Sequence, residues 1–195
     1  DFIEGPFDQT IKTGNFPVLS SIVGAAFGGA SPFQAEIYFI NLAGLIQTGF
    51  AVPFFDVADP RFLDYAVPVA VRGDIRFKIT DYKEFIKLHR LINFDLEDFK
   101  SQIKSAVTKY VKSVVANIPS EKGIPVIQLE RKLTEINDVV EESLKKRLQN
   151  EFGVTISSVD IDAIDIDKTS DGYNKLKAVT QDITSQTIQR QSNAN

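Results

Sequence analysis

Four aspartates are the residues of this chain whose type and spacing could best support chemistry. They are Asp160, Asp162, Asp165 and Asp167. Carboxylates are the oxygen ligands that Ca²⁺ and Mg²⁺ prefer, which makes a metal-dependent hydrolase using the Asp160–Asp167 cluster one hypothesis. The run lacks the glycine and the distal glutamate of an EF-hand loop, and strand alternation places Asp160 and Asp162 on one face and Asp165 and Asp167 on the other. We therefore prefer a charged strand that discourages edge-to-edge aggregation.

The other candidates for catalysis are few. His89 is the single histidine and stands between basic neighbours, which predicts a solvated helix position and not a triad or a metal site. There is no cysteine, and the glycines at 24, 28 and 29 lack the lysine of a phosphate-binding loop. We therefore predict no catalytic residue, no cofactor and no metal site, and hence no enzyme.

Charge and aromatic residues limit the partners. The net charge of −4 argues against nucleic acid, which requires clustered basic side chains. Lys100, Lys104 and Lys112 fit the solvent side of an amphipathic helix better than a membrane-binding patch. Phe54 and Phe55, with Phe50 nearby, are expected in the core, and would form a contact patch only if they were exposed.

The front of the chain is almost uncharged. Between Thr13 and Phe55 the only charged residue is Glu36. Residues 13–35 are long enough to span a membrane, but two prolines and four glycines favour a packed loop or an interfacial segment. Residues 35–41 are predicted as a buried strand, residues 42–49 as a turn, and residues 50–57 as a β-rich stretch broken by Pro53. Asp59-Pro60 predicts a turn.

Residues 67–79 have the clearest pattern in the chain. Apolar residues and glycine alternate with polar or small ones, which is typical of a strand with one buried face. A hairpin turn at Gly73-Asp74 would place a charge beside nearly every apolar residue, so we predict one continuous strand.

Helices and a second strand follow. Asp81, with Glu84 three residues later, predicts the start of a helix that runs to about Leu91. Asp95 begins a second, amphipathic helix, and residues 119–125 are predicted as a loop. A third helix includes Leu129 and ends before Gly153. Residues 154–167 form a strand whose alternation changes phase, which suggests bulges. A final helix begins at Asp171.

These patterns together resemble the SPFH or band 7 family, which includes stomatins, prohibitins, flotillins and HflK/C. The matching pieces are residues 69–81, the two helices after them, and residues 151–164. Residues 13–20 and 28–41 resemble the bacterial YdjI-like branch, whose members are often labelled virion core protein. Two features common in that branch are missing, a Gly-Thr-Tyr-like start at Gly73 and a zinc-binding tail.

The resemblance implies an α+β (mixed α/β) fold, with a mostly antiparallel sheet packed with amphipathic helices and a C-terminal helix leading toward a coiled coil. We divide the chain into a β-rich front (1–57), a band 7-like core (58–168) and a C-terminal helix with a polar tail (169–195). Self-association is expected through the β-rich front and the C-terminal helix, with Leu176, Val179 and Ile183 as the contact residues of the helix.

The resemblance also implies a function without catalysis. We expect a homo-oligomeric scaffold that organises an assembly at a membrane surface or around a membrane-stress protein partner. Its place would be the cytoplasm or the inner face of the cell membrane. Two alternatives remain open, a monomeric adaptor that binds a partner protein through residues 13–55 and the metal-dependent hydrolase.

Overall fold

The computed structural model describes residue 2, residues 4–5 and residues 37–194. The chain divides into two compact units, residues 1–39 and residues 40–195. Most of the first unit, including the predicted interfacial segment 13–35, lies outside the described residues. The second unit contains, in chain order, β1 (Ile46–Asp59), β2 (Phe62–Lys78), α2 (Tyr82–Leu88), α3 (Leu96–Lys122), the 3-10 helix η2 (Val126–Arg131), α4 (Leu133–Phe152), β3 (Thr155–Ile166) and α5 (Asp171–Asn193).

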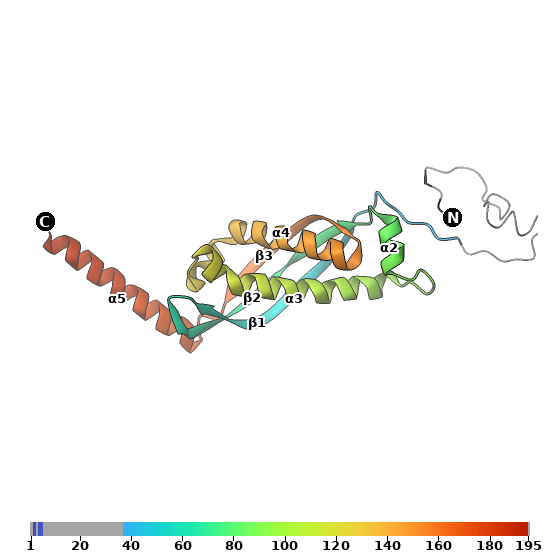
Figure 1. The fold of residues 1–195 in the computed structure, drawn as a ribbon. Coiled ribbons are helices and arrows are strands. Elements are labelled where there is room, and N and C mark those ends of the chain that lie inside the picture. The colour runs from blue at the N-terminus through green and yellow to red at the C-terminus, as the bar shows by residue number, and fades with distance from the viewer. Residues whose placement is uncertain (1, 3, 6–36, 195) are drawn as a thin grey trace, which may run out of the picture. The chain divides into compact units, whose positions relative to one another are not determined.

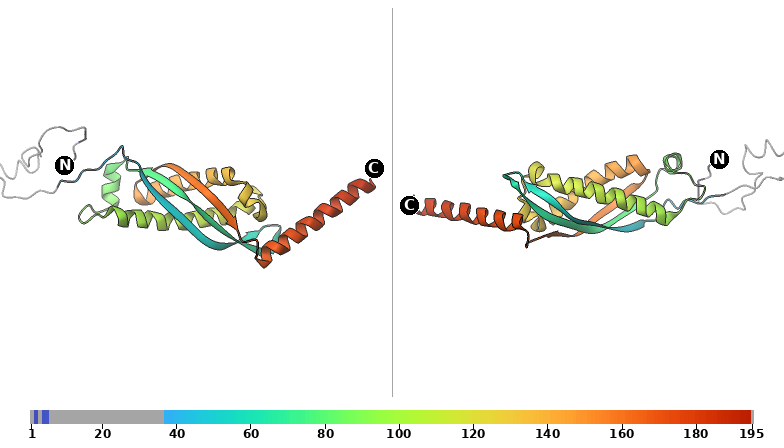
Figure 2. Two further views of the ribbon diagram at one scale, coloured as in Figure 1. Left: turned by 180° about the vertical axis from the view of Figure 1, so that it is seen from behind. Right: turned by 90° about the horizontal axis from the view of Figure 1, so that it is seen from below.

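The second unit is built as one sheet with two long helices on one of its faces. The three strands are antiparallel in the order β1-β2-β3. Helices α3 and α4 lie side by side, with α3 packed mainly on β1 and α4 mainly on β3 (Figure 1; Figure 2). The predicted α+β fold, with an antiparallel sheet, amphipathic helices and a C-terminal helix, is confirmed.

β2 is the continuous central strand that the alternation predicted. The core contains Val67, Val69, Val71, Ile75 and Phe77, all of them buried. Gly73 does not form a hairpin, because it pairs with Phe50 on β1 and with Ile161 on β3. A side chain at this position would collide with the backbone carbonyl of Asp160, so glycine permits the close approach of β2 and β3.

β3 contains the bulges that its change of phase suggested. Arg72 pairs with Ala163 while Gly73 pairs with Ile161, so Asp162 is the extra residue. A second register shift lies between Arg76 and Phe77. The bulges keep the isoleucines of β3 on the buried face.

The prediction that the aspartates are split between two sheet faces is therefore wrong. Asp160 and Asp165 pair with Asp74 and Ala70, which lie on the same face of β2. Asp160, Asp162 and Asp165 are all exposed, and Asp167 lies beyond the end of the strand.

The predicted strand at 35–41 is also wrong where the structure describes it. Residues 37–41 are not in a strand, and Phe39 is 86% exposed. The side chain of Asn41 instead accepts hydrogen bonds from the backbone N–H groups of Ala43 and Gly44, which forms a turn. β1 begins at Ile46, inside the segment predicted as a turn, because Ile46 pairs with Phe77.

The remaining strand and turn predictions of this region hold. The stretch around Pro53 belongs to β1, with a register shift between Val52 and Phe55. A proline is tolerated there because β1 is an edge strand. The turn predicted at Asp59-Pro60 joins β1 to β2.

Three helix boundaries differ from the prediction. α2 ends at Leu88, and the carboxylate of Asp81 caps it by accepting the N–H of Glu84 at 3.0 Å. α3 continues through Pro119, which is buried in the core, to Lys122. Gly123, with a φ of 67°, ends the helix. Leu129 belongs to η2 and not to the third helix, because Lys132 separates η2 from α4.

Candidate self-association surface

The first turns of α5 are attached to the sheet. The Ser170 hydroxyl caps the helix by accepting the N–H of Tyr173 at 3.2 Å. Gly172 lies against the backbone of Ala66 on β2, where a larger residue would collide with the carbonyl of Ala66. Leu176 is 1% exposed and belongs to the core. The root of α5 is therefore fixed by packing.

The three residues predicted for self-association have different surroundings. Leu176 packs inside its own chain, Val179 is half-buried, and Ile183 is 51% exposed. From Gln181 to Ala194 every residue is exposed. Only Val179 and Ile183 of the predicted set are thus free to meet another molecule in this conformation.

The aspartate cluster does not come together as a metal site. Among the described residues, no group of three or more histidine, cysteine, aspartate or glutamate side chains is placed to hold a metal ion. Asp167 accepts hydrogen bonds from the hydroxyl of Thr169 at 2.6 Å and from its N–H at 2.9 Å, which lower the pKa of Asp167. Asp167 thereby forms the turn that leads into α5.

The prediction of a solvated His89 is wrong, because this side chain is half-buried among aromatic rings. His89 Nε2 donates a hydrogen bond to the carbonyl oxygen of Phe152 at 2.9 Å. Its ring lies 4.7 Å from that of Phe85 and 5.0 Å from that of Phe99, measured between centroids. His89 therefore ties the end of α2 to the end of α4, a contact between residues far apart in sequence that helix periodicity could not reveal.

Replacing His89 with alanine should lower the free energy of unfolding by about 2 kcal/mol. The change removes the hydrogen bond to Phe152 and several ring contacts from a packed site. Urea unfolding measures the effect, with Arg90→Ala as the exposed neighbouring control, for which a change within about 0.5 kcal/mol is expected. Equal effects of the two substitutions would contradict the assigned role of His89.

The lysines of α3 and the phenylalanines of β1 were the other side chains considered for contacts with a membrane or a partner. Lys104 and Lys112 are exposed and Lys100 is half-buried. Phe50 and Phe55 are buried as predicted, but Phe54 is 57% exposed on β1. A single exposed aromatic ring does not by itself mark a site.

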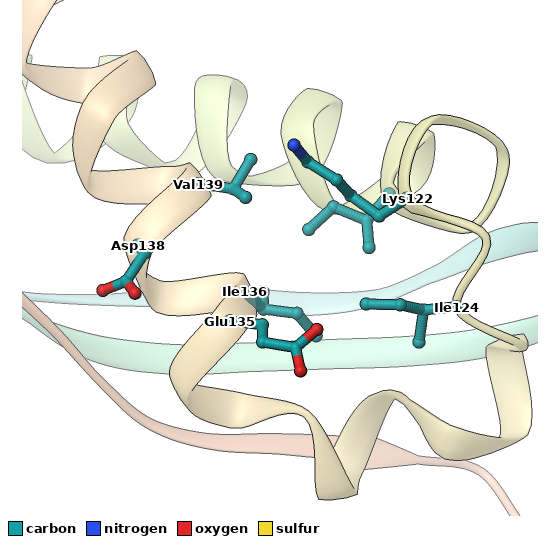
Figure 3. A pocket seen from close by; sticks show the side chains of 7 residues that line it. Lys122, Ile124, Glu135, Ile136, Asp138 and Val139 are labelled. Carbon is teal, nitrogen blue, oxygen red and sulfur yellow. The ribbon is translucent and has the colours of Figure 1, made fainter.

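A shallow depression of about 260 Å³ lies between the end of α3 and the start of α4. Figure 3 shows the apolar side chains of Ile124, Ile136 and Val139 and the charged side chains of Lys122, Glu135 and Asp138, which line it. Glu135 is paired with Lys132 at 3.5 Å. The lining residues include no histidine, cysteine, serine or threonine.

The one buried charged group among the described residues is Asp59, which is 0% exposed. Arg61 donates to it from Nε and Nη2, both at 3.1 Å, and the backbone N–H of Val126 donates at 3.4 Å. Burial alone would raise the pKa of Asp59, but these hydrogen bonds and the charge of Arg61 lower it below the usual 3.8. This network joins the β1–β2 turn to η2, whereas only the turn was predicted from the sequence.

Comparison with known protein families gives a match to the SPFH domain-Band 7 family over residues 2–178. This match covers most of the chain and includes the sheet, α3, α4 and the root of α5. The chain belongs to the SPFH domain-Band 7 family. SPFH domains are in general non-enzymatic and associated with membranes. A comparison with curated proteins finds no significant match.

For the described part of this SPFH domain, no helix combines the length and the apolar character needed to cross a membrane. The outer part of α5, from Gln181 to Ala194, is exposed in this SPFH domain.

Proposed function

We propose that this SPFH domain is a non-enzymatic scaffold whose copies associate through α5 and organise an assembly at a membrane surface or around a membrane-stress protein. The observation that carries the proposal is the placement of α5. The helix has 23 residues, and only its first turns pack on the rest of the chain. Helices in water gain most of their stability from packing an apolar face, so the exposed part of α5 calls for a partner.

A second copy is the partner that fits the exposed part of α5. Val179 and Ile183 continue the three- and four-residue spacing that begins at the buried Leu176. This spacing is that of a coiled-coil seam, in which equivalent residues of two helices meet. The helix would thus carry the association outward from a folded root.

The cellular location that we propose for the assembly follows from what is general for SPFH domains. SPFH domains generally work at membranes, and we place this one in the cytoplasm, at the inner face of the cell membrane. We also assign it to the bacterial YdjI-like branch, on the strength of residues 13–20 and 28–41.

Replacing Ile183 with glutamate should raise the protein concentration needed for self-association at least about tenfold, because a charge would enter an apolar seam. Light scattering coupled to size exclusion measures the mass. Ser185→Glu adds the same charge on another side of α5 and is expected to leave the mass unchanged. Leu176 is unsuited to this test, because its substitution would damage the core.

The I183E variant should keep the thermal unfolding of the wild type. Loss of association with an unchanged melt supports the proposal. Association of I183E equal to that of the wild type would exclude the α5 seam as the contact.

A monomeric adaptor is the second candidate. It is favoured by exposed apolar side chains before β1, namely Ile37 at 46%, Phe39 at 86% and Leu45 at 58%. The adaptor requires a chain that stays monomeric at every concentration and binds its partner through this segment.

A further inference from the structure

We infer that the connection between β3 and α5 is a rigid joint, in which Glu130 of η2 is the positioning residue that fixes the direction of α5. The direction of the helix is then set inside each chain, before α5 meets any other molecule. The inference concerns a single chain, and its consequence for the geometry of an assembly rests on the proposed function.

The connection is short and its groups bond to one another. β3 ends at Ile166 and α5 begins at Asp171, so four residues join them. The carboxylate of Asp167 accepts the N–H and the hydroxyl of Thr169, at 2.9 and 2.6 Å. The hydroxyl of Ser170 donates to the carbonyl oxygen of Asp167 at 2.7 Å and accepts the N–H of Tyr173 at 3.2 Å. These bonds leave the connection little freedom to rotate.

Glu130 attaches the connection to η2 on both sides of Asp167. Its Oε1 accepts the N–H of Ile166 at 3.1 Å, and its Oε2 pairs with Lys168 Nζ at 3.2 Å. The N–H of Asp167 itself donates to the carbonyl oxygen of Pro68 on β2 at 3.0 Å. Three successive residues are thus held by groups outside the connection.

η2 is a firm base for this attachment. The side chains of Val126 and Leu129 are fully buried in the core. The N–H of Val126 also donates to the buried carboxylate of Asp59 at 3.4 Å. A segment held in this way cannot follow a moving α5, so the bonds from Glu130 resist rotation of the helix.

The first turns of α5 transmit this restraint to the rest of the helix. Gly172 lies against the backbone of Ala66, and Leu176 is buried in the core. A helix of 23 residues is about 35 Å long, so a rotation of about 10° at its root moves its far end by about 6 Å. Small changes at the joint are therefore measurable at the exposed end of α5.

The angle between α5 and the sheet decides how the domains of associated copies are placed. If the exposed parts of α5 from two chains pack together, each domain is oriented by its own joint. A fixed angle gives every copy the same geometry, which an assembly of defined size requires. A loose joint would allow several geometries with the same helix contact.

The direction of α5 is measured as a distance within one chain. The sequence has no cysteine, so two introduced cysteines can be spin-labelled selectively. Ser113→Cys on α3 and Ser185→Cys on α5 use exposed positions. All samples also carry Ile183→Glu and are dilute enough to show the mass of a monomer by light scattering, so that no second helix restrains α5. Pulsed electron double resonance gives the distribution of distances between the two labels.

The otherwise unchanged chain should give one narrow distribution. Glu130→Ala should widen it at least about twofold, because the N–H of Ile166 and the Lys168 ammonium both lose their acceptor. Glu130→Gln keeps an acceptor oxygen for Ile166 and should widen the distribution less. Glu135→Ala is the matched control, since it removes a carboxylate of α4 that pairs with Lys132 at 3.5 Å, and it should leave the width unchanged.

Three results would overturn the inference. They are a broad distribution in the chain with Glu130, an unchanged width in E130A, and equal widening in E135A. Thermal melts establish that each variant is folded at the temperature of the measurement, and if E130A is not, an unchanged width in E130Q overturns the inference instead. None of these results depends on the mass of the wild type, so the joint and the proposed scaffold are tested separately.

Discussion

Asp59→Ala is expected to lower the free energy of unfolding by about 3 kcal/mol, which is a large effect for one substitution. The variant loses the two side-chain bonds from Arg61 and leaves the buried N–H of Val126 without its carboxylate acceptor. The attachment of η2 to the β1–β2 turn is lost with them. Urea unfolding followed by circular dichroism measures the change.

The dependence on pH separates the charge of Asp59 from its shape. The pKa of Asp59 is lowered in the folded chain, so its stabilising contribution is complete above the unfolded pKa and is lost as the pH falls through the lower folded value. Asp59→Asn keeps the shape but does not titrate. The difference in stability between the wild type and D59N should be constant above about pH 5 and shrink at lower pH. A difference that stays the same down to acid pH would show that the carboxylate charge contributes nothing.

Gly73→Ala is expected to destabilise the sheet by about 3 kcal/mol. The added Cβ would point into the space between β2 and β3, against the carbonyl of Asp160, and would lie 3.0 Å from Phe50 Cζ and from the Cα of Ile161. Two of these three neighbours are backbone atoms, which cannot rotate away. Thermal unfolding measures the loss.

Gly49→Ala is the matched control for the G73A variant. Gly49 lies on the edge strand β1, and an added Cβ would come no closer than 3.3 Å to the Asp74 side chain, which can move. Alanine also restricts the unfolded chain, so G49A should be neutral or stabilising by up to about 1 kcal/mol. Similar losses in G49A and G73A would refute the close approach of β2 and β3 as the reason for glycine at 73.

The sequence predicted the parts of this fold that depend on local periodicity. Residues 67–79 alternate without interruption, and the structure has β2 there. Asp81 and Asp95 are helix caps in the sequence and in the structure. The loop predicted from Pro119 onward is wrong, because burial of Ile118 and Pro119 and the cap at Gly123 outweigh the missing N–H of a proline near a helix end.

Contacts between residues far apart in the sequence could not be predicted from its local patterns. The N–H of Val126, 67 residues away, donates to the Asp59 carboxylate, and His89 donates to the carbonyl oxygen of Phe152, 63 residues away. Leu176 shares a spacing with Val179 and Ile183, and a spacing alone cannot tell which residues face the core of the same chain. The sheet face on which each aspartate lies depends on the bulge in β3. The position of that bulge is defined by the pairing of β3 with β2.

Self-association is the central claim, and the solution mass across a range of concentrations tests it most directly. The monomer has a mass of 21.7 kDa. Light scattering coupled to size exclusion should give a larger mass that grows with concentration from the micromolar range upward, or a discrete multiple of the monomer. A mass of one monomer at every concentration would contradict the scaffold and favour the adaptor.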